Sequence, residues 1–262
     1  MSTAAPSVIE LKCEPLVESL VGMLSETSGI TVLTGAGVSA ESGIPTFRGK
    51  DGLWRTYSAT ELATPEAFSR DPKTVWEWYA YRRDLIGRAR PNNAHLALAE
   101  LENIFDEFTL VTQNVDGLHS SAGSRKVIEL HGNIWRSRCT GGCGTMPLPV
   151  IDEFPPRCKC GALLRPDVVW FGEPLDSEPI ARAVAAASSS DIMMVVGTSS
   201  IVYPAAEIPV AAKERGALLI EINPERTPLS PMADFCVLDK AGVALPKIVS
   251  AILSSIRKVY ER

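Results

Sequence analysis

The sequence predicts an α/β fold built on a doubly wound, mainly parallel sheet, together with a smaller second domain. Three observations carry this prediction. Continuous apolar runs alternate with helix-length segments, as expected of strands that are buried on both faces. The first of these runs leads directly into a glycine turn, and two segments of different composition interrupt the alternation.

Five apolar runs are expected to be strands, and five segments are expected to be helices. The strands are 29–34, 109–112, 192–196, 217–222 and 235–238. The helices are 15–26, 93–105, 178–188, 205–215 and about 245–259. This alternation is typical of a parallel sheet with helices on both faces, and it defines the main domain.

The two interrupting segments predict the smaller domain, over one edge of the sheet. Residues 47–90 are rich in aromatic side chains and are expected to be helical, with Pro65 and Pro72 near helix starts. Residues 138–166 contain clustered cysteines, glycine and proline, and they show little periodicity. The predicted main domain therefore consists of residues 1–46, 91–137 and 167–262.

The composition is that of a soluble globular protein, with 262 residues, 45% hydrophobic and 22% charged. A net charge of −5 and the lack of a long Lys/Arg run argue against nucleic-acid binding. No secretory signal is recognisable, and glycine and prolines break the most apolar stretch, 192–212, so no membrane-spanning helix is expected. We expect a cytoplasmic monomer that binds neither nucleic acid nor membrane.

Four of the six cysteines are clustered, as Cys139-x3-Cys143 and Cys158-x-Cys160. Two close pairs of thiols can complete a tetrahedral zinc site, and four protein ligands leave no position for water. The alternative is a set of unlinked buried thiols, which the glycine-rich setting disfavours. We therefore expect one structural Zn2+, so that the smaller domain is part helical and part zinc-binding.

The glycine turn reads Gly35-Ala36-Gly37-Val38-Ser39-Ala40 and fits the G-x-G-x-x-(G/A) pattern of Rossmann-like dinucleotide-binding domains. Its glycines let the backbone approach a pyrophosphate closely. A tight connection between two elements is the alternative that this motif alone leaves open. Dehydrogenases carry an acidic residue about 20 positions later, and its absence here argues against hydride transfer.

Three further predicted strands end in polar turns, at 113–119, 197–200 and 223–225. The same residue types also form ordinary turns. Because parallel strands end at one edge of a sheet, four such turns are better explained by a ligand of dinucleotide length. His131 is one of three histidines and follows a short apolar run. A single histidine is more often structural than catalytic, but histidine side chains ordinarily titrate near neutral pH, which suits a general base.

With the glycine turn, the polar turns and His131 taken together, the chain resembles the sirtuin family of NAD-dependent protein deacylases. The matching motifs follow the family's order over about residues 29–241. They are GAGVSAESGIPTFR at 35–48, TQNVDGLH at 112–119, LHG at 130–132, LRP at 164–166, FGE at 171–173 and GTS at 197–199. So many ordered motifs make the resemblance specific for nearly the whole chain.

The resemblance implies that NAD lies extended across the strand ends of the main domain. The implied NAD contacts are Gly35, Ala36, Gly37, Ser39, Ala40, Ile44, Pro45, Phe47, Arg48, Gln113, Asn114, Val115, Asp116, Gly197, Thr198, Ser199, Asn223, Pro224, Glu225 and Ala241. Asn114 and Asp116 would act at the nicotinamide end, and His131 would be the general base for a ribose hydroxyl. The acyl-lysine oxygen would attack the ribose, nicotinamide would leave, and the acyl group would pass to ADP-ribose, so NAD would be consumed.

Tyr79 and Arg82 share one face of a predicted helix. From the spacing alone, an ordinary solvated helix face explains them. The sirtuin subgroup that removes acidic acyl groups carries Tyr-x-x-Arg here, so the resemblance implies a preference for succinyl-, malonyl- or glutaryl-lysine, with acetyl-lysine also accepted. The small side chain of Ala63 would leave room for the longer acyl chain.

The resemblance further implies that an acyl-lysine peptide pairs as a strand with two segments. The implied peptide contacts are Val169, Phe171, Val202 and Tyr203. An ordinary core strand is the alternative for 168–171. Two rival functions also stay open, an ADP-ribosyltransferase with the same NAD site and a non-catalytic NAD-sensing or zinc-stapled binding module.

Overall fold

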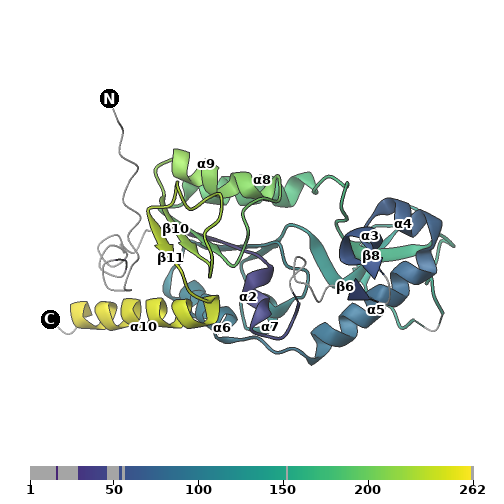
Figure 1. The fold of residues 1–262 in the computed structure, drawn as a ribbon, viewed down its shortest axis with the longest axis horizontal. Helices are drawn as coiled ribbons and strands as arrows, with labels where there is room; N and C mark the ends of the chain where they lie inside the picture. Colours follow the sequence, from purple (N-terminus) through teal and green to yellow (C-terminus); the bar gives the residue numbers. More distant parts are fainter. Residues whose placement is uncertain (1–15, 17–28, 46–52, 55–56, 152, 261–262) are drawn as a thin grey trace.

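The computed structural model describes residues 16, 29–45, 53–54, 57–151 and 153–260. A six-stranded sheet with helices on both sides occupies one end of an elongated molecule, and a smaller group of helices and strands occupies the other end (Figure 1). The expected helix at 15–26 lies outside the described residues apart from Leu16, and so do the implied NAD contacts Phe47 and Arg48.

The large sheet is parallel throughout and has a Rossmann-like strand order. Across the sheet the order is β11-β10-β9-β1-β4-β5, so the chain winds outward from β1 in one direction and then from β9 in the other. This confirms the predicted doubly wound sheet. The reversal between β1 and β9 is the place where such folds bind their ligands. The strands are β1 (Ile30–Thr34), β4 (Phe108–Thr112), β5 (Val127–Glu129), β9 (Ile192–Val196), β10 (Leu218–Ile222) and β11 (Phe235–Val237).

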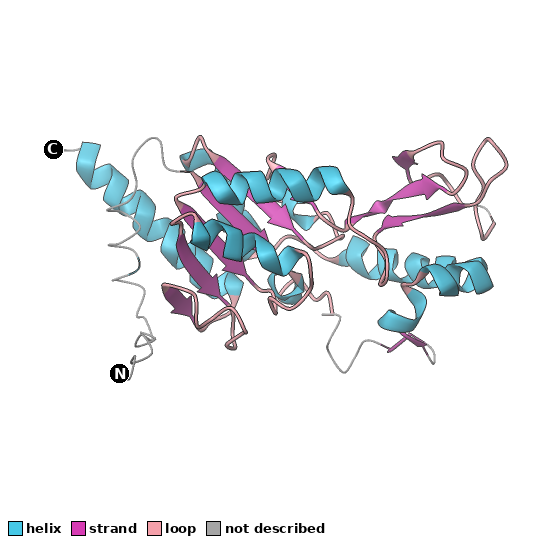
Figure 2. Cartoon of the chain, turned by 90° about the horizontal axis from the view of Figure 1, so that it is seen from above, coloured by secondary structure: helices cyan, strands magenta, loops and turns pink. Residues whose placement is uncertain are grey.

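Helices cover both faces of this sheet, as Figure 2 shows from above. Alternate side chains of each strand supply the two cores. In β9, Ile192 and Met194 belong to the cluster under α6 and α10, whereas Met193 and Val195 belong to the cluster under α8 and α9. The apolar run is continuous because both faces are buried. These helices are α6 (Asn93–Ile104), α8 (Ser177–Ser189), α9 (Ile208–Glu214) and α10 (Ala241–Tyr260).

Two helices differ from their predicted bounds. Helix α10 begins at Ala241, earlier than the expected start near Leu245, and the N–H of Gly242 in its first turn donates to the Glu41 carboxylate at 2.8 Å. The segment expected as one helix at 205–215 begins with a 3-10 turn, Ala205–Glu207, before α9. Pro209 lies in the first turn of α9, where its missing N–H costs no hydrogen bond.

The aromatic-rich segment is helical from Ala59 to Arg88, apart from short connections, whereas its described residues before Ala59 form two short strands that were not predicted. Thr64 and Asp71 cap α4 and α5 by accepting main-chain N–H groups at 3.1 Å, and each cap is followed by a proline in the first turn. The predicted helix starts near Pro65 and Pro72 are therefore confirmed. The elements here are β2 (Leu53–Trp54) and β3 (Tyr57–Ser58), which pair antiparallel, and α3 (Ala59–Leu62), α4 (Pro65–Arg70) and α5 (Pro72–Arg88).

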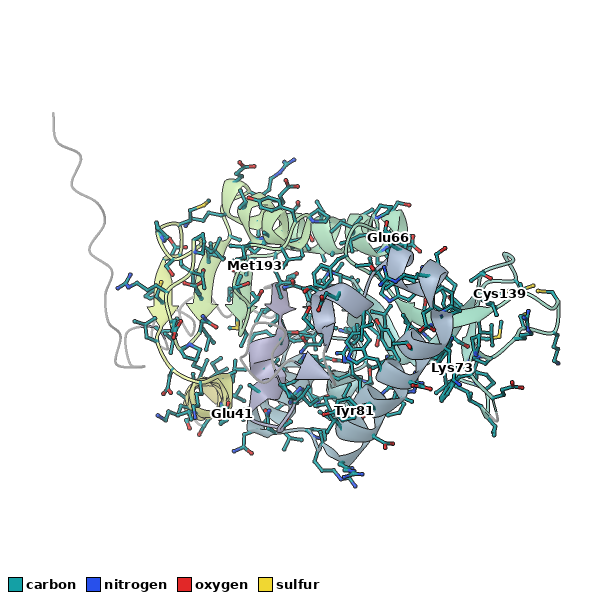
Figure 3. All side chains as sticks on the ribbon, turned by 45° about the vertical axis from the view of Figure 1, so that its right-hand side comes forward. Glu41, Glu66, Lys73, Tyr81, Cys139 and Met193 are labelled. Atoms are coloured by element: carbon teal, nitrogen blue, oxygen red, sulfur yellow. The ribbon has the colours of Figure 1, made fainter. Side chains whose placement is uncertain are left out.

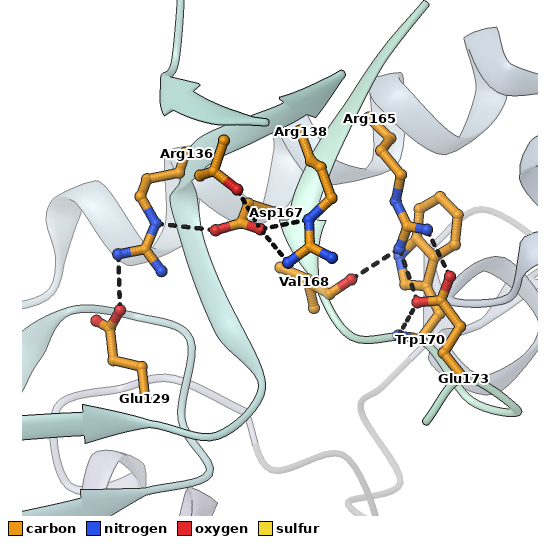
Figure 4. Close-up of polar contacts among 9 residues, drawn as sticks. Glu129, Arg136, Arg138, Arg165, Asp167, Val168, Trp170 and Glu173 are labelled. Carbon is orange, nitrogen blue, oxygen red and sulfur yellow. Dashed lines mark hydrogen bonds and ion pairs between the residues drawn. The ribbon is translucent and has the colours of Figure 1, made fainter. Parts of the chain in front are cut away.

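A three-stranded antiparallel sheet was not predicted. It consists of β7 (Thr145–Pro147), β6 (Gly132–Cys139) and β8 (Leu164–Val168), in that order. Asp167 joins two of its strands, because the Nε atoms of Arg136 and Arg138 donate to its two carboxylate oxygens at 2.9 and 3.0 Å (Figure 4). Arg136 also pairs with Glu129 at 2.9 Å, which ties this sheet to the edge strand β5.

The helices of the described residues include none that is both long and apolar enough to cross a membrane.

Candidate active site

Two strand-end turns interlock at the reversal point between β1 and β9. A Cβ atom on Gly35 would lie 2.7 Å from Cβ of Thr198, and one on Gly37 would lie 2.7 Å from the carbonyl oxygen of Gly197. Gly197 itself has a φ of +60°, and a Cβ there would lie 2.5 Å from the nitrogen of Val38. Only glycine fits these positions, so the short helix α2 (Ala36–Ala40) is held directly against the turn after β9.

The turn after β4 joins the same site through a buried network. The Asn114 amide donates to the Ser39 hydroxyl and to the Gly35 carbonyl oxygen, both at 3.1 Å. Ser39 in turn donates to Asp116 at 2.7 Å, and the other carboxylate oxygen of Asp116 accepts the N–H of Leu118 at 2.9 Å. Asn114 and Asp116 are thus buried, paired and fixed against the glycine turn. Leu118 begins the short helix α7 (Leu118–Ser121).

His131 is half-buried in the turn between β5 and β6. Its Nδ1 lies 2.9 Å from the carbonyl oxygen of Gln113. A carbonyl oxygen only accepts, so Nδ1 carries the proton and Nε2 is the basic nitrogen of the neutral ring. Burial lowers the pKa of His131 below its usual value, and the hydrogen bond to Gln113 opposes this in part. His131 is therefore neutral at pH 7, as a general base must be.

Two further histidines, for which no role was predicted, lie next to this network. The rings of His95 and His119 are 4.8 Å apart, and both are buried. Thr34 uses its one hydroxyl proton to donate to Thr112, so Nε2 of His119, 2.9 Å from the Thr34 hydroxyl, must be the donor there. Burial, followed by the neighbouring His95, lowers the pKa of His119 to about 3. His119 is therefore neutral.

Further hydrogen bonds link the turns after β4 and β9 and hold the turn after β10. The amide of Gln113 donates to the Thr198 hydroxyl at 3.0 Å, which links the turns after β4 and β9. After β10, the Asn223 amide donates to the carbonyl oxygen of Glu225 at 2.7 Å, and Pro224 and Glu225 are exposed. Behind this turn the buried carboxylate of Glu221 accepts the hydroxyls of Thr227 and Ser230.

The other implied NAD contacts have mixed surroundings. Ser199 is half-buried, Thr198 and Ala241 are buried, and Ile44 packs against the core of the small helices and sheet. All four predicted polar turns lie at the carboxyl ends of the parallel strands, after β1, β4, β9 and β10. The implied contacts placed on these turns are Gly35, Ala36, Gly37, Ser39, Ala40, Gln113, Asn114, Val115, Asp116, Gly197, Thr198, Ser199, Asn223, Pro224 and Glu225.

Tyr79 and Arg82 lie together in the interior rather than on a solvated helix face. Tyr79 is fully buried, and its hydroxyl accepts the indole N–H of Trp170 at 2.9 Å. The Arg82 guanidinium lies 5.2 Å from the ring centroid of Trp78 and 5.8 Å from that of Tyr79. Burial lowers the pKa of Arg82, and the nearby Tyr79 and Asp116 oppose this shift. Arg82 of α5 is thus close enough to the turn that carries Asp116 to interact with its carboxylate electrostatically.

The two segments implied for peptide binding carry exposed apolar side chains. Phe171, Val202 and Tyr203 are exposed, whereas Val169 is half-buried and its N–H donates to the carbonyl oxygen of His131 at 2.9 Å. The N–H of Phe171 donates to the carbonyl oxygen of Ala63, also at 2.9 Å. His131, the candidate general base, and Ala63, which is expected to leave room for the acyl group, both accept hydrogen bonds from the segment that contains Val169 and Phe171.

Arg165 and Glu173 brace this segment and were recognised in the sequence only as parts of motifs. Arg165 donates to Glu173 at 2.5 and 2.8 Å, and its guanidinium lies 3.4 Å from the ring centroid of Trp170 (Figure 4). The N–H of Trp170 donates to the same carboxylate at 2.8 Å. The ion pair thereby fixes the tryptophan that holds Tyr79.

The four clustered cysteines form a candidate metal site far from the parallel sheet. Figure 3 shows Cys139 near one end of the molecule, well away from Met193 of β9. The Sγ atoms of the four lie within 4.8 Å of one another, and those of Cys139 and Cys160 are 3.5 Å apart. Zn–S bonds of about 2.3 Å in a tetrahedron need sulfurs about 3.8 Å apart. The set therefore fits a structural Zn2+, held by Cys139, Cys143, Cys158 and Cys160.

Comparison with known proteins yields consistent matches. The family model described as Sir2 family matches residues 35–204. An NAD-dependent protein deacylase of Aquifex aeolicus is 56% identical over 230 residues, 85% of this chain and 95% of the relative. NAD-dependent protein deacylase 2 of Pyrobaculum aerophilum is 52% identical over 242 residues, 91% of this chain and 97% of the relative.

Solved structures match over similar lengths. A Sir2 homologue in complex with NAD has a TM-score of 0.86 at 46% identity, covering 95% of this chain and 96% of that chain. A complex described as Sir2, p53 peptide and NAD+ has a TM-score of 0.80 at 31% identity, covering 92% of this chain and 98% of that chain.

Proposed function

Because this chain belongs to the Sir2 family, we propose that it is an NAD-dependent protein-lysine deacylase that transfers the acyl group to ADP-ribose and releases nicotinamide. One observation carries the proposal above all. A neutral histidine, His131, is fixed through Nδ1 to the Gln113 carbonyl oxygen, beside the strand ends where four polar turns meet. The named relatives, all deacylases, support this reading of the site.

The strand ends fit an extended dinucleotide. The glycine turn and the turn after β9 meet at the topological reversal, where Rossmann-like sheets bind nucleotides. From there the turns after β4 and β10 extend the site in both directions along the sheet edge. When bound, NAD supplies the ADP-ribose group that receives the acyl group, with nicotinamide as leaving group. The residues that would hold it are those on these turns, together with Ile44, Pro45, Phe47, Arg48 and Ala241.

Within this site His131 would accept the proton of a ribose hydroxyl at Nε2. The Gln113 carbonyl oxygen fixes the ring and its tautomer, so that the basic nitrogen is available without rearrangement. As the proton arrives, the same carbonyl oxygen stabilises the charged ring, because Nδ1 keeps its hydrogen bond. A positioned general base of this kind contributes about 10²- to 10⁴-fold to the rate.

Asn114 and Asp116 would act at the nicotinamide end. Both are buried and held by Ser39, so their polar groups are oriented before any ligand arrives. Such preorganisation means that little reorganisation is needed during the reaction. Their distance from bulk water also strengthens their interactions with a developing charge.

For the acyl group we propose that succinyl-, malonyl- or glutaryl-lysine is preferred and acetyl-lysine is also accepted. The half-buried Arg82 beside the buried Tyr79 would offer a cation and a phenol to a carboxylate. The electrostatic interaction of Arg82 with Asp116 supports a location for this cation near the nicotinamide end, where the acyl-lysine would enter. The small side chain of Ala63 would leave room for a longer acyl chain.

The peptide backbone would pair with the segments that contain Val169 and Phe171 on one side and Val202 and Tyr203 on the other. Pairing through main-chain groups predicts weak sequence preference. The expected domain division completes the proposal, with residues 47–90 and 138–166 forming the smaller domain over the NAD-binding domain. We propose further that the chain acts as a cytoplasmic monomer without nucleic-acid or membrane partners, in line with its acidic net charge and its thiol ligands.

One assay tests the function. An acylated peptide is incubated with NAD and the purified chain, and the products are identified by mass spectrometry. We expect free lysine peptide, nicotinamide and O-acyl-ADP-ribose in equal amounts. An ADP-ribosylated peptide would favour the transferase, and no NAD consumption at all would favour a binding module.

A further inference from the structure

A second concave site lies outside the candidate active site, between α5 and the loop that follows β7. It is an open groove of about 530 Å³, within the size range of small-ligand sites. One wall is the face of α5 that carries Ala80, Arg83, Asp84, Gly87 and Arg88. The other walls are apolar, and the side chains that matter for its chemistry are Trp135, Ile151 and Phe154.

Arg83, Asp84 and Arg88 are the charged residues that line this groove, and of these only Arg83 is buried. The Arg83 side chain lines the groove although the residue is only 7% exposed. Its Nη1 is enclosed and has no hydrogen-bond partner, and no carboxylate of the described residues forms an ion pair with it. Burial lowers the pKa of Arg83 to about 10, so the guanidinium is still charged at pH 7.

The surroundings compensate only part of the lost hydration of this charge. The exposed Asp84, the next residue of α5, attracts the guanidinium electrostatically but forms no ion pair with it. The guanidinium lies 5.1 Å from the ring centroid of Trp76, a cation–π contact, and Trp76 stacks on Phe154. A buried cation without a hydrogen-bonded counter-charge is costly, and an anion in the groove would relieve that cost. The groove therefore favours an anion over a cation, and its apolar walls favour an anion with an apolar body.

We propose that this groove binds a small amphipathic carboxylate, whose charged group pairs with Arg83 and whose apolar part lies against Trp135, Ile151 and Phe154. The site is distinct from the Tyr79–Arg82 pair and does not depend on the deacylase proposal. Trp135 connects the two regions, because its indole N–H donates to the carbonyl oxygen of Asp116 at 2.8 Å. A ligand against Trp135 thus contacts the residue that anchors the Asp116 turn.

The test uses 4-phenylbutyrate as probe and its neutral amide, 4-phenylbutyramide, as the matched control ligand. Binding to the full chain is followed by the ¹H–¹⁵N signal of the Trp135 indole, assigned with a Trp135→Phe variant. We expect a saturable shift with the carboxylate and an affinity for the amide weaker by about tenfold or more, since a charge-assisted pair is lost. Equal affinities, or no shift of the Trp135 signal, would overturn the proposal.

Two variants locate the charge that is responsible. Arg83→Met should weaken carboxylate binding by about tenfold or more and leave the amide unaffected, whereas Arg82→Met should change neither. Loss in Arg82→Met with binding retained in Arg83→Met would place the probe in the acyl site instead and refute the groove. If Arg83→Met does not fold, Arg83→Lys decides the question together with the ligand pair, because it keeps the charge and should retain discrimination against the amide.

Discussion

Gly37 and Gly197 approach so closely that a Cβ atom on Gly37 would lie 2.7 Å from the carbonyl oxygen of Gly197. Their hydrogen bond, from the N–H of Gly37 to that oxygen at 2.8 Å, joins the turns after β1 and β9. The two turns meet at these glycines, at the base of the proposed NAD site. Because the backbones approach so closely, both turns need glycine there.

Substitution of Gly37 by alanine should push these turns apart. Overpacking of this kind costs about 1–3 kcal/mol of unfolding free energy, and NAD should bind more weakly as well. Urea unfolding and an NAD titration measure the two effects. Gly87→Ala is the control, because a Cβ there meets only Cη2 of Trp135 at an ordinary 3.6 Å and a helix interior favours alanine. Equal stability of the two variants would contradict the close approach.

Replacing Arg82 by methionine tests the acyl preference. Methionine keeps apolar contact with Trp78 and Tyr79 but removes the charge. Loss of a charge-assisted pair should lower kcat/KM for a succinyl peptide by about 10- to 150-fold, with a much smaller loss for the acetyl peptide of the same sequence. Arg70→Met, at an exposed arginine of α4, should change neither. Parallel losses on both peptides would refute the clamp.

His119 makes stability depend on pH. The folded chain keeps it neutral down to about pH 3, whereas in the unfolded chain it takes up a proton near its ordinary pKa of about 6.5. Between these values the unfolded state binds more protons, so the free energy of unfolding falls as the pH falls, by about 1.4 kcal/mol per pH unit. Urea unfolding from pH 7 to pH 4 should show a shallower decline in His119→Gln than in the unaltered chain. An unchanged slope would contradict a neutral, buried His119.

Zinc removal should destabilise the small sheet rather than remove the catalytic groups. Cys139 ends β6, so the metal would hold β6 against the loop that carries Cys158 and Cys160. We expect about one zinc per chain in the native protein, and Cys143→Ser should lower both the zinc content and the Tm. Metal analysis with calorimetry measures this, and Cys236→Ser, away from the cluster, is the control. Zinc well below one per chain would count against the site.

The parts of the fold that sequence predicted are those whose physical cause is local. Continuous apolar runs followed by glycine or polar turns identify buried parallel strands, and Pro65 and Pro72 mark helix starts. The small sheet escaped prediction because its register shifts between Asn133 and Ser137, so β6 has no regular alternation of buried residues.

Contacts between segments that are distant in sequence could not be predicted either. His95 and His119 come together only when α6 packs against α7, and neither residue has a neighbour in sequence that points to the other. The Gln113 carbonyl oxygen that orients His131 is a main-chain group, which no sequence motif encodes. The motifs thus identified the residues of the candidate site, whereas their tautomers, burial and pairing required the structure.

The central claim is that His131 serves as the general base of an NAD-consuming deacylation, and its alanine variant tests this most directly. O-acyl-ADP-ribose formation by His131→Ala is measured at an NAD concentration shown by titration to saturate the variant. We predict that NAD binding stays largely intact while product formation falls by about 10²- to 10⁴-fold. Near-normal product formation by the saturated variant would contradict the account.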